Sequence, residues 1–186
     1  SGVTNWSQGI DNSASDAYVL SASSALGTTN VMSASTAGQV NWPLQPLFIA
    51  NAQSNVANVT GDNTTYTVLF DSVNVNVGNS YNSGTGTFTA PVAGNYLFRT
   101  GLGISEIGVA HTSLIIQLVS SGGTRELIRL NPSVIAASGV VTFEGSGIIA
   151  LASSGTCVVQ LTVSGSTKTV DIAGVPVSWF EGALLT

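Results

Sequence analysis

Short apolar runs with a period of two, broken by Gly, Asn or Ser, are the feature that most constrains the fold of this 186-residue chain. Val73, Val75 and Val77 alternate with Asn74 and Asn76, which predicts a strand with one buried face and one wet face. The 3.6-residue period of an amphipathic helix is hard to find in any part of the chain. The pattern therefore predicts an all-β sandwich or barrel with tight, polar turns.

Other short apolar runs predict further strands. These runs lie at 114–119, 127–130, 140–143, 157–163 and 175–185. The first two flank Ser120-Ser121-Gly122-Gly123, which predicts a hairpin. We expect the last run to close the sheet.

The composition changes near Trp42-Pro43. Residues 1–43 are rich in Ser, Ala, Asn and Thr, and their apolar side chains are scattered singly. Such a segment has too little apolar mass for an independent core, so it either stays unfolded or is completed by neighbouring chains. We predict an N-terminal β/turn neck at 1–45, completed by neighbouring chains, and a second, larger domain at 46–186.

Charge and cysteine content exclude several classes of protein. Only 4 residues are basic, and the net charge is −5, so the chain cannot neutralise a row of phosphates and we predict no nucleic-acid partner. No run reaches the ~18 apolar residues of a membrane helix, so we predict no membrane insertion. Cys157 is the single cysteine, which excludes an intrachain disulfide and favours a buried, inert thiol.

Candidate catalytic and metal-binding residues are few. His111 is the only histidine, and no Gly-x-Ser-x-Gly motif accompanies it. We interpret it as a half-exposed loop residue that is a poor candidate for a general base. Asp11 and Asp16 lie in an oxygen-rich loop, yet the spacing of a calcium-binding EF-hand is missing and such residues usually cap turns. We predict no enzymatic activity, no cofactor and no metal.

The remaining charged residues fit a solvated surface. Arg125, Glu126 and Arg129 lie on one short strand. We expect Arg125 and Arg129 to point to the same face, either toward solvent or into a salt bridge between subunits. Arg99 follows Phe98 and is expected to point away from the core. A glycosidase needs two carboxylates a few ångströms apart, and the small number of acidic residues, 9 in the chain, disfavours such a pair.

Two motifs resemble a known family. Phe88 ends one expected strand, Pro91 and Gly94 form a turn, and Tyr96 and Phe98 share one face of the next strand. This stretch resembles the signature of the globular head of the q subunit of complement's first component, whose jelly roll is shared with the tumour-necrosis-factor superfamily. The ending at 180–185 is similar to the closing strand of that family. The signature residues are Phe88, Pro91, Gly94, Tyr96, Phe98, Phe180 and Gly182.

The resemblance implies a jelly-roll β-sandwich of about ten strands that assembles as a homotrimer. Five residues are then expected near the core or the three-fold axis: Leu47, Phe48, Ile49, Trp179 and Leu184. A face with few charges can be buried against its own copies without the desolvation of ions.

Four segments suggest a branch of this family. Residues 58–62 and 66–71 are similar to heads on bacteriophage tail-fibre proteins, and residues 6–13 and 25–30 are similar to a segment that precedes such heads. No collagen-like Gly-X-Y run precedes the head. The resemblance implies the extracellular, trimeric tip of a tail fibre or related virion appendage that binds a host-surface glycan or protein. The alternative is a structural decoration or trimerisation domain of a virion or bacterial surface protein, without its own receptor.

Recognition is expected in loops, because loops on a rigid β scaffold commonly carry binding residues. The candidate receptor-binding residues are Ser105, Glu106, His111, Ser121, Thr124, Ser166 and Lys168.

Overall fold

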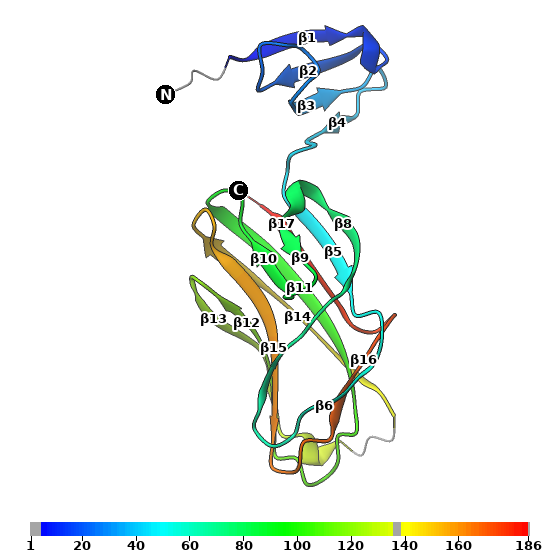
Figure 1. Cartoon of the computed structure of the whole chain (residues 1–186), viewed down its shortest axis with the longest axis vertical. Helices are drawn as coiled ribbons and strands as arrows, with labels where there is room; N and C mark the ends of the chain where they lie inside the picture. Colours follow the sequence, from blue (N-terminus) through cyan, green and yellow to red (C-terminus); the bar gives the residue numbers. More distant parts are fainter. Residues whose placement is uncertain (1–4, 136–138, 186) are drawn as a thin grey trace. The chain divides into compact units, whose positions relative to one another are not determined.

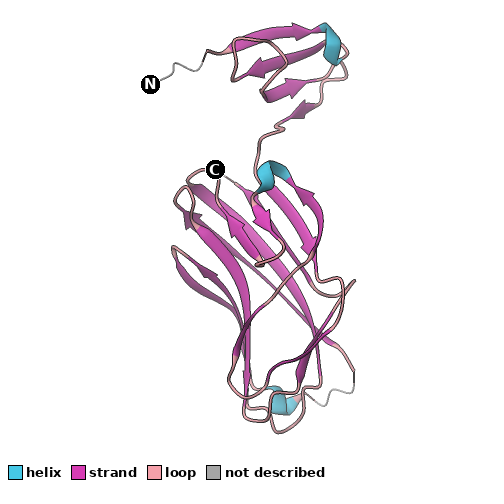
Figure 2. Ribbon diagram, viewed as in Figure 1, coloured by secondary structure: helices cyan, strands magenta, loops and turns pink. Residues whose placement is uncertain are grey.

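The computed structural model describes residues 5–135 and 139–185, which divide into two compact units between Gln45 and Pro46 (Figure 1). Within the described residues all regular structure is β, apart from three short 3-10 turns, η1 (Asn12–Ala14), η2 (Val77–Asn79) and η3 (Pro132–Val134) (Figure 2). The all-β prediction is therefore confirmed.

The N-terminal unit is a four-stranded antiparallel meander. Its strands follow one another in the order β1 (Ser7–Asp11), β2 (Ala17–Ser21), β3 (Asn30–Ala34) and β4 (Val40–Asn41). Asp11 accepts a hydrogen bond from the Ser13 N–H at 3.0 Å, so this carboxylate caps the η1 turn, as the sequence predicted.

The head consists of two antiparallel sheets. The larger sheet has the order β6-β16-β11-β17-β5-β8, with β14 pairing β11; the smaller has the order β13-β12-β15-β10-β9, with β7 pairing β15. The larger sheet contains β5 (Leu47–Asn51), β6 (Val56–Thr60), β8 (Ser72–Asn76), β11 (Gly94–Ser105), β14 (Val141–Leu151), β16 (Val170–Ala173) and β17 (Trp179–Leu184). The smaller sheet contains β7 (Thr65–Thr67), β9 (Tyr81–Asn82), β10 (Thr87–Thr89), β12 (Ser113–Ser120), β13 (Gly123–Leu130) and β15 (Thr156–Ser164).

The core of the head is dominated by aromatic rings. The Phe48 ring stacks on Tyr81 with centroids 4.7 Å apart and meets the edge of Phe180 at 4.9 Å. Phe88 lies 5.2 Å from Phe98 in an edge-to-face arrangement. Each such pair contributes about 0.5–1.5 kcal/mol beyond its buried area. The signature residues Phe88, Tyr96, Phe98 and Phe180 all belong to this core.

The turn of the signature is held by hydrogen bonds from outside it. The Tyr96 hydroxyl donates to the Val92 carbonyl oxygen at 2.7 Å. The Ala90 N–H donates to the Gly155 carbonyl, and the Ser154 N–H donates to the Ala90 carbonyl, both at 2.7 Å. The turn between β10 and β11 is thus joined to the turn between β14 and β15.

Most strand predictions agree with the structure, but two need correction. The runs at 114–119 and 157–163 lie in β12 and β15, and the hairpin at 120–123 joins β12 to β13. The closing strand begins only at Trp179 rather than at 175, because residues 175–177 form a turn. Val73 lies in β8 as expected but is 37% exposed, and Val77 lies in η2 rather than in the strand. A β-bulge sets Val73 opposite Ala50 and Val75 opposite Ile49, so the valines do not form one buried face.

A β-bulge overturns the prediction for the two arginines of β13. The pairing shifts between Ile116 and Gln117, so that Arg125 is opposite Leu118 and Arg129 is opposite Ile115. Opposite residues share a face of an antiparallel sheet, and Leu118 points into the core whereas Ile115 does not. Arg125 and Arg129 therefore lie on opposite faces.

Arg125 and Arg129 also have different partners. Arg129 donates to Glu126 within the same strand at 2.9 Å. The Arg125 side chain lies over Gly147 of β14, where a β-carbon would be 2.7 Å from its Cδ.

Candidate functional site

The outward face of the larger sheet carries an apolar row. The register places Leu47 of β5, Ala183 of β17, Leu97 of β11 and Ile148 of β14 opposite one another across four adjacent strands. The residues that alternate with them point into the core, so the row points away from it. Leu47 is 38% exposed and Ile148 is 54% exposed. The head therefore presents an apolar row on the outward face of its larger sheet. We call this outward face the head face.

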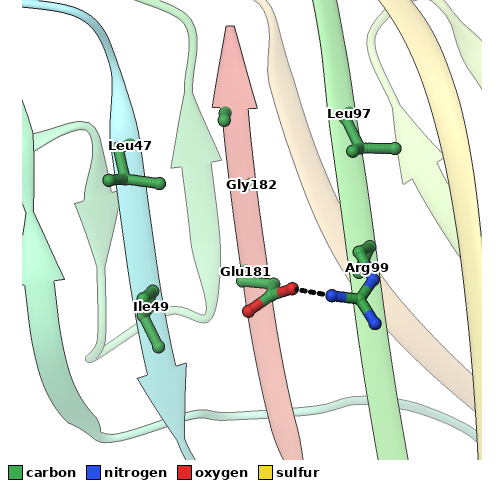
Figure 3. A pocket seen from close by; sticks show the side chains of 7 residues that line it. Leu47, Ile49, Leu97, Arg99, Glu181 and Gly182 are labelled. Carbon is green, nitrogen blue, oxygen red and sulfur yellow. Dashed lines mark hydrogen bonds and ion pairs between the residues drawn. The ribbon is translucent and has the colours of Figure 1, made fainter.

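An ion pair lies beside this row. Arg99 of β11 and Glu181 of β17 are directly opposite, and Arg99 Nη1 donates to Glu181 Oε1 at 2.7 Å (Figure 3). The Arg99 guanidinium also lies 5.4 Å from the ring centre of Trp179. An exposed pair of this kind contributes little stability, about 0–1 kcal/mol. Arg99 points away from the core, as predicted.

Gly101 makes room for the Trp179 indole. A β-carbon at Gly101 would lie 2.5 Å from Trp179 Nε1, so only glycine lets the indole lie directly over β11. The two residues are opposite each other in the sheet. The indole is thereby held at the border of the head face, half-buried.

A shallow pocket of about 150 Å³ lies within the head face (Figure 3). It is lined by Leu47, Ile49, Leu97, Arg99, Glu181, Gly182 and Ala183. Sites for small molecules usually have roughly 300–1,000 Å³. The pocket is thus smaller than a usual site for a whole small ligand.

Of the five residues expected near the core or axis, Phe48 lies in the core and Leu184 packs against it. Leu47, Ile49 and Trp179 lie on the outward side of the sheet. Sequence reasoning missed Leu97 and Ile148, although the alternation of Leu97 with Tyr96 and Phe98 was a signal for an outward apolar residue.

The predicted receptor-binding residues lie at both ends of the head. Ser105 is opposite Asp171, and the Thr112 N–H donates to the Ser164 carbonyl at 2.9 Å, so the loops at 105–112 and 165–169 are adjacent (Figure 1). These loops hold Ser105, Glu106, His111, Ser166 and Lys168. The other two residues, Ser121 and Thr124, lie at the opposite end of the β12–β15 pair, where Ser120 is opposite Cys157.

His111 is buried rather than half-exposed, which corrects the prediction. Its side chain is 2% exposed, and its Nδ1 accepts the Gly108 N–H at 3.0 Å. Nε2 is buried without a hydrogen-bond partner among the described residues and lies 3.2 Å from the position of a Gly61 β-carbon. The imidazole therefore packs inside the loop cluster. Glu106 and Lys168 are exposed, and Ser105 and Ser166 are half-buried.

The side chains that could act as a nucleophile or a metal ligand have structural roles. Cys157 is fully buried, and burial raises the pKa of its thiol to about 12, which disfavours the reactive thiolate. Asp62 accepts the Thr64 N–H at 3.1 Å, and the hydrogen bonds from Thr64 lower the pKa of this exposed carboxyl. Within residues 5–135 and 139–185, no three His, Cys, Asp or Glu residues gather as metal ligands. The same residues contain no helix long and apolar enough to cross a bilayer.

Solved structures with a similar fold come from complement and tumour-necrosis-factor-like proteins. The globular domain of the zebrafish complement 1qA protein is 17% identical with a TM-score of 0.52, covering 76% of this chain and 98% of its own. Murine APRIL is 10% identical with a TM-score of 0.53, and the match covers 76% of this chain and 99% of the APRIL chain. The Eiger TNF of S. frugiperda is 13% identical with a TM-score of 0.52, and the match covers 76% of this chain and 94% of the Eiger chain. At these identities the likeness shows the fold alone.

A search of curated proteins finds no match. The sequence model of the C1q domain matches residues 48–185, which span both sheets of the head and include all seven signature residues. The jelly-roll prediction is confirmed, and the chain belongs to the C1q domain family.

Proposed function

We propose that this chain is the homotrimeric tip of a bacteriophage tail fibre or a related virion appendage, and that it binds a glycan or a protein on the host surface. C1q and tumour-necrosis-factor-like domains are binding and structural domains without catalytic activity, typically extracellular, and they often form trimers. The observation that carries the homotrimer for this chain is the apolar row of the head face.

Self-association accounts for the chemistry of the head face. Burying the exposed parts of Leu47 and Ile148 is favourable by about 25 cal/mol for each Å² of apolar surface. Arg99 and Glu181 already neutralise each other within one chain, so a copy that covers them meets no unpaired charge from this pair. A three-fold arrangement is a closed ring in which each chain contacts both neighbours, so no chain is left with an uncovered contact surface.

Host binding is supported by the loop cluster and by the phage-like segments. Glu106 and Lys168 are exposed at one end of the head, where loops from separate parts of the sequence meet on a rigid scaffold. Three copies would strengthen a weak contact with a repeated surface ligand through avidity. Residues 6–13, 25–30, 58–62 and 66–71 support the placement on a virion.

The homotrimer is tested by a charge on the head face. Ile148→Lys changes a residue that is 54% exposed in the single chain, so the variant should fold. We expect light scattering to give the mass of three chains for the native protein and of one chain for Ile148→Lys. Val134→Lys is the matched control, because Val134 is 83% exposed on η3, outside the head face. A trimeric Ile148→Lys variant would contradict the use of this face.

Host binding is tested with the labelled, intact protein on cells that the parent phage infects. Binding should compete with phage adsorption. Joint replacement of Glu106 and Lys168 by alanine should abolish binding, whereas joint replacement of Ser121 and Thr124 should reveal whether the opposite end contributes. Full binding by both double variants would refute the loop assignment. A trimer that neither binds such cells nor blocks adsorption would instead support the structural alternative.

A further inference from the structure

The N-terminal sheet carries a second apolar face, which we call the neck face. The register places Ile10, Tyr18, Ala34 and Val40 in one row across all four strands. Gln8, Leu20 and Met32 form the next row on the same face. Ile10 and Val40 are each 57% exposed, and Tyr18 is 37% exposed.

The opposite face is covered by the chain itself. Ala17, Val19 and Ser21 are buried there beneath the loop at 22–29. The Ala22 N–H donates to the Thr29 carbonyl at 2.9 Å, and the Gly27 N–H donates to Ser21 Oγ at 3.1 Å. The loop also brings Leu26 over Gly9, where a β-carbon would lie 3.6 Å from Leu26 Cδ2. Within residues 5–45 the sheet is thus covered on one face and open on the other.

This unit needs further burial to be stable. Ala17 and Val19 are its buried apolar residues among those described. Units of about 40 residues are usually stabilised by disulfides, metals or association. The single cysteine of the chain, Cys157, lies in the head, so no disulfide can form within the N-terminal unit.

We infer that the neck face is a homotypic interface, packed against the neck faces of two further copies of this chain. The inference rests on the proposed homotrimer. Around a three-fold axis a charged side chain would face its own copies, and the neck face has none. The two carboxylates of the unit lie elsewhere, Asp11 on the covered face and Asp16 in the turn before β2.

One polar contact of the neck face is made within the chain. The Tyr18 hydroxyl donates to Gln8 Oε1 at 2.8 Å, so these two oxygen atoms need no partner from outside the chain. A second copy that brings apolar surface would leave this hydrogen bond intact.

The covalent connection favours copies of the same chain over any other partner. β4 ends at Asn41 and β5 of the head begins at Leu47, so only five residues connect the two units. Once the heads form a trimer, three neck faces are held at an effective concentration in the millimolar range. Even a weak contact between these faces would then be occupied.

Cysteine labelling in the full chain tests the inference. Val40→Cys places a thiol on the neck face, and Asn41→Cys places one on the other face of the same strand; both positions are exposed in the single chain. We expect a maleimide to label Val40→Cys at least about tenfold more slowly than Asn41→Cys, because a thiol at an interface reacts only after local opening. Both thiols should react equally in denaturant, and the buried Cys157 provides the background in the native protein.

The mass of each variant, measured by light scattering, separates this inference from the proposed function. Equal labelling rates in a protein with the mass of three chains would overturn the neck interface and leave the head trimer intact. A native protein with the mass of one chain would overturn the homotrimer, and the neck interface with it. If Val40→Cys disturbs assembly, Ala34→Cys with Ser33→Cys as its control gives a second pair on opposite faces of β3.

Discussion

Replacing Gly182 by alanine tests why the closing strand contains a glycine in the middle of the core. A β-carbon at this position would lie 2.6 Å from Phe48 Cε1 and 2.7 Å from Phe98 Cδ1. Both rings are fully buried and packed against other aromatic rings, so neither can move aside cheaply. The glycine is therefore required for space, and one added methyl group overpacks the core.

We expect Gly182→Ala to lower the free energy of unfolding by about 1–3 kcal/mol, the usual cost of overpacking. The assay is equilibrium denaturation in urea, followed by tryptophan fluorescence at a fixed chain concentration. Gly108→Ala is the control, because a β-carbon at Gly108 meets no atom within 4 Å; its stability should change by less than about 0.5 kcal/mol. If both variants lose equally little stability, the steric explanation of the signature glycine is wrong.

Three further predictions concern buried groups of the head. Burial raises the pKa of Cys157 to about 12, so the folded state retains a proton that the unfolded thiol loses above its ordinary pKa of about 8.5. The free energy of unfolding therefore falls as the pH rises above about 8.5. At pH 10 the Cys157 thiol should lower it by about 2 kcal/mol. Denaturation of Cys157→Ala at pH 7 and pH 10 should show a correspondingly weaker pH dependence, and identical slopes would contradict the assignment. Tyr96→Phe removes the hydrogen bond to the Val92 carbonyl and should cost about 0.5–1.5 kcal/mol in the same urea assay; an unchanged midpoint would argue against a structural role of the hydroxyl. Thr60→Val removes the acceptor of the buried Val163 N–H and should lower the free energy of unfolding by about 1–3 kcal/mol. Thr60→Ser keeps the hydroxyl and should retain most of this stability. An equal loss in Thr60→Ser would show that the methyl group matters rather than the hydroxyl.

The parts of the fold that depend on local pattern could be predicted from the sequence. β12 and β15 follow from alternation and β-branched runs, and the turn after Phe88 follows from Pro91 and Gly94. These signals lie within a few residues of the structure that they specify. The aromatic positions of the signature identify the core because each ring must be buried next to the others.

Features that depend on contacts between distant segments could not be predicted. His111 is buried where its ring lies against Gly61, a residue far from it in the sequence, and no local pattern shows that contact. The opposite faces of Arg125 and Arg129 result from a bulge, which shifts the register by one residue without a signal in the alternation. The head face likewise can be recognised only once the strand order is known, because its residues come from four separate strands.

The position of β17 has a consequence for how the head folds. This strand lies between β5 and β11 in the larger sheet, so residues 47–51 cannot be connected to β11 until residues 179–184 have been synthesised. Contacts this distant in sequence make folding slow, because a long loop must close before the pairing of β5 with β17 stabilises the sheet. During that interval the apolar strands are exposed to aggregation. We therefore expect the nascent head to depend on chaperones, and its assembly to begin only after synthesis has passed Leu184.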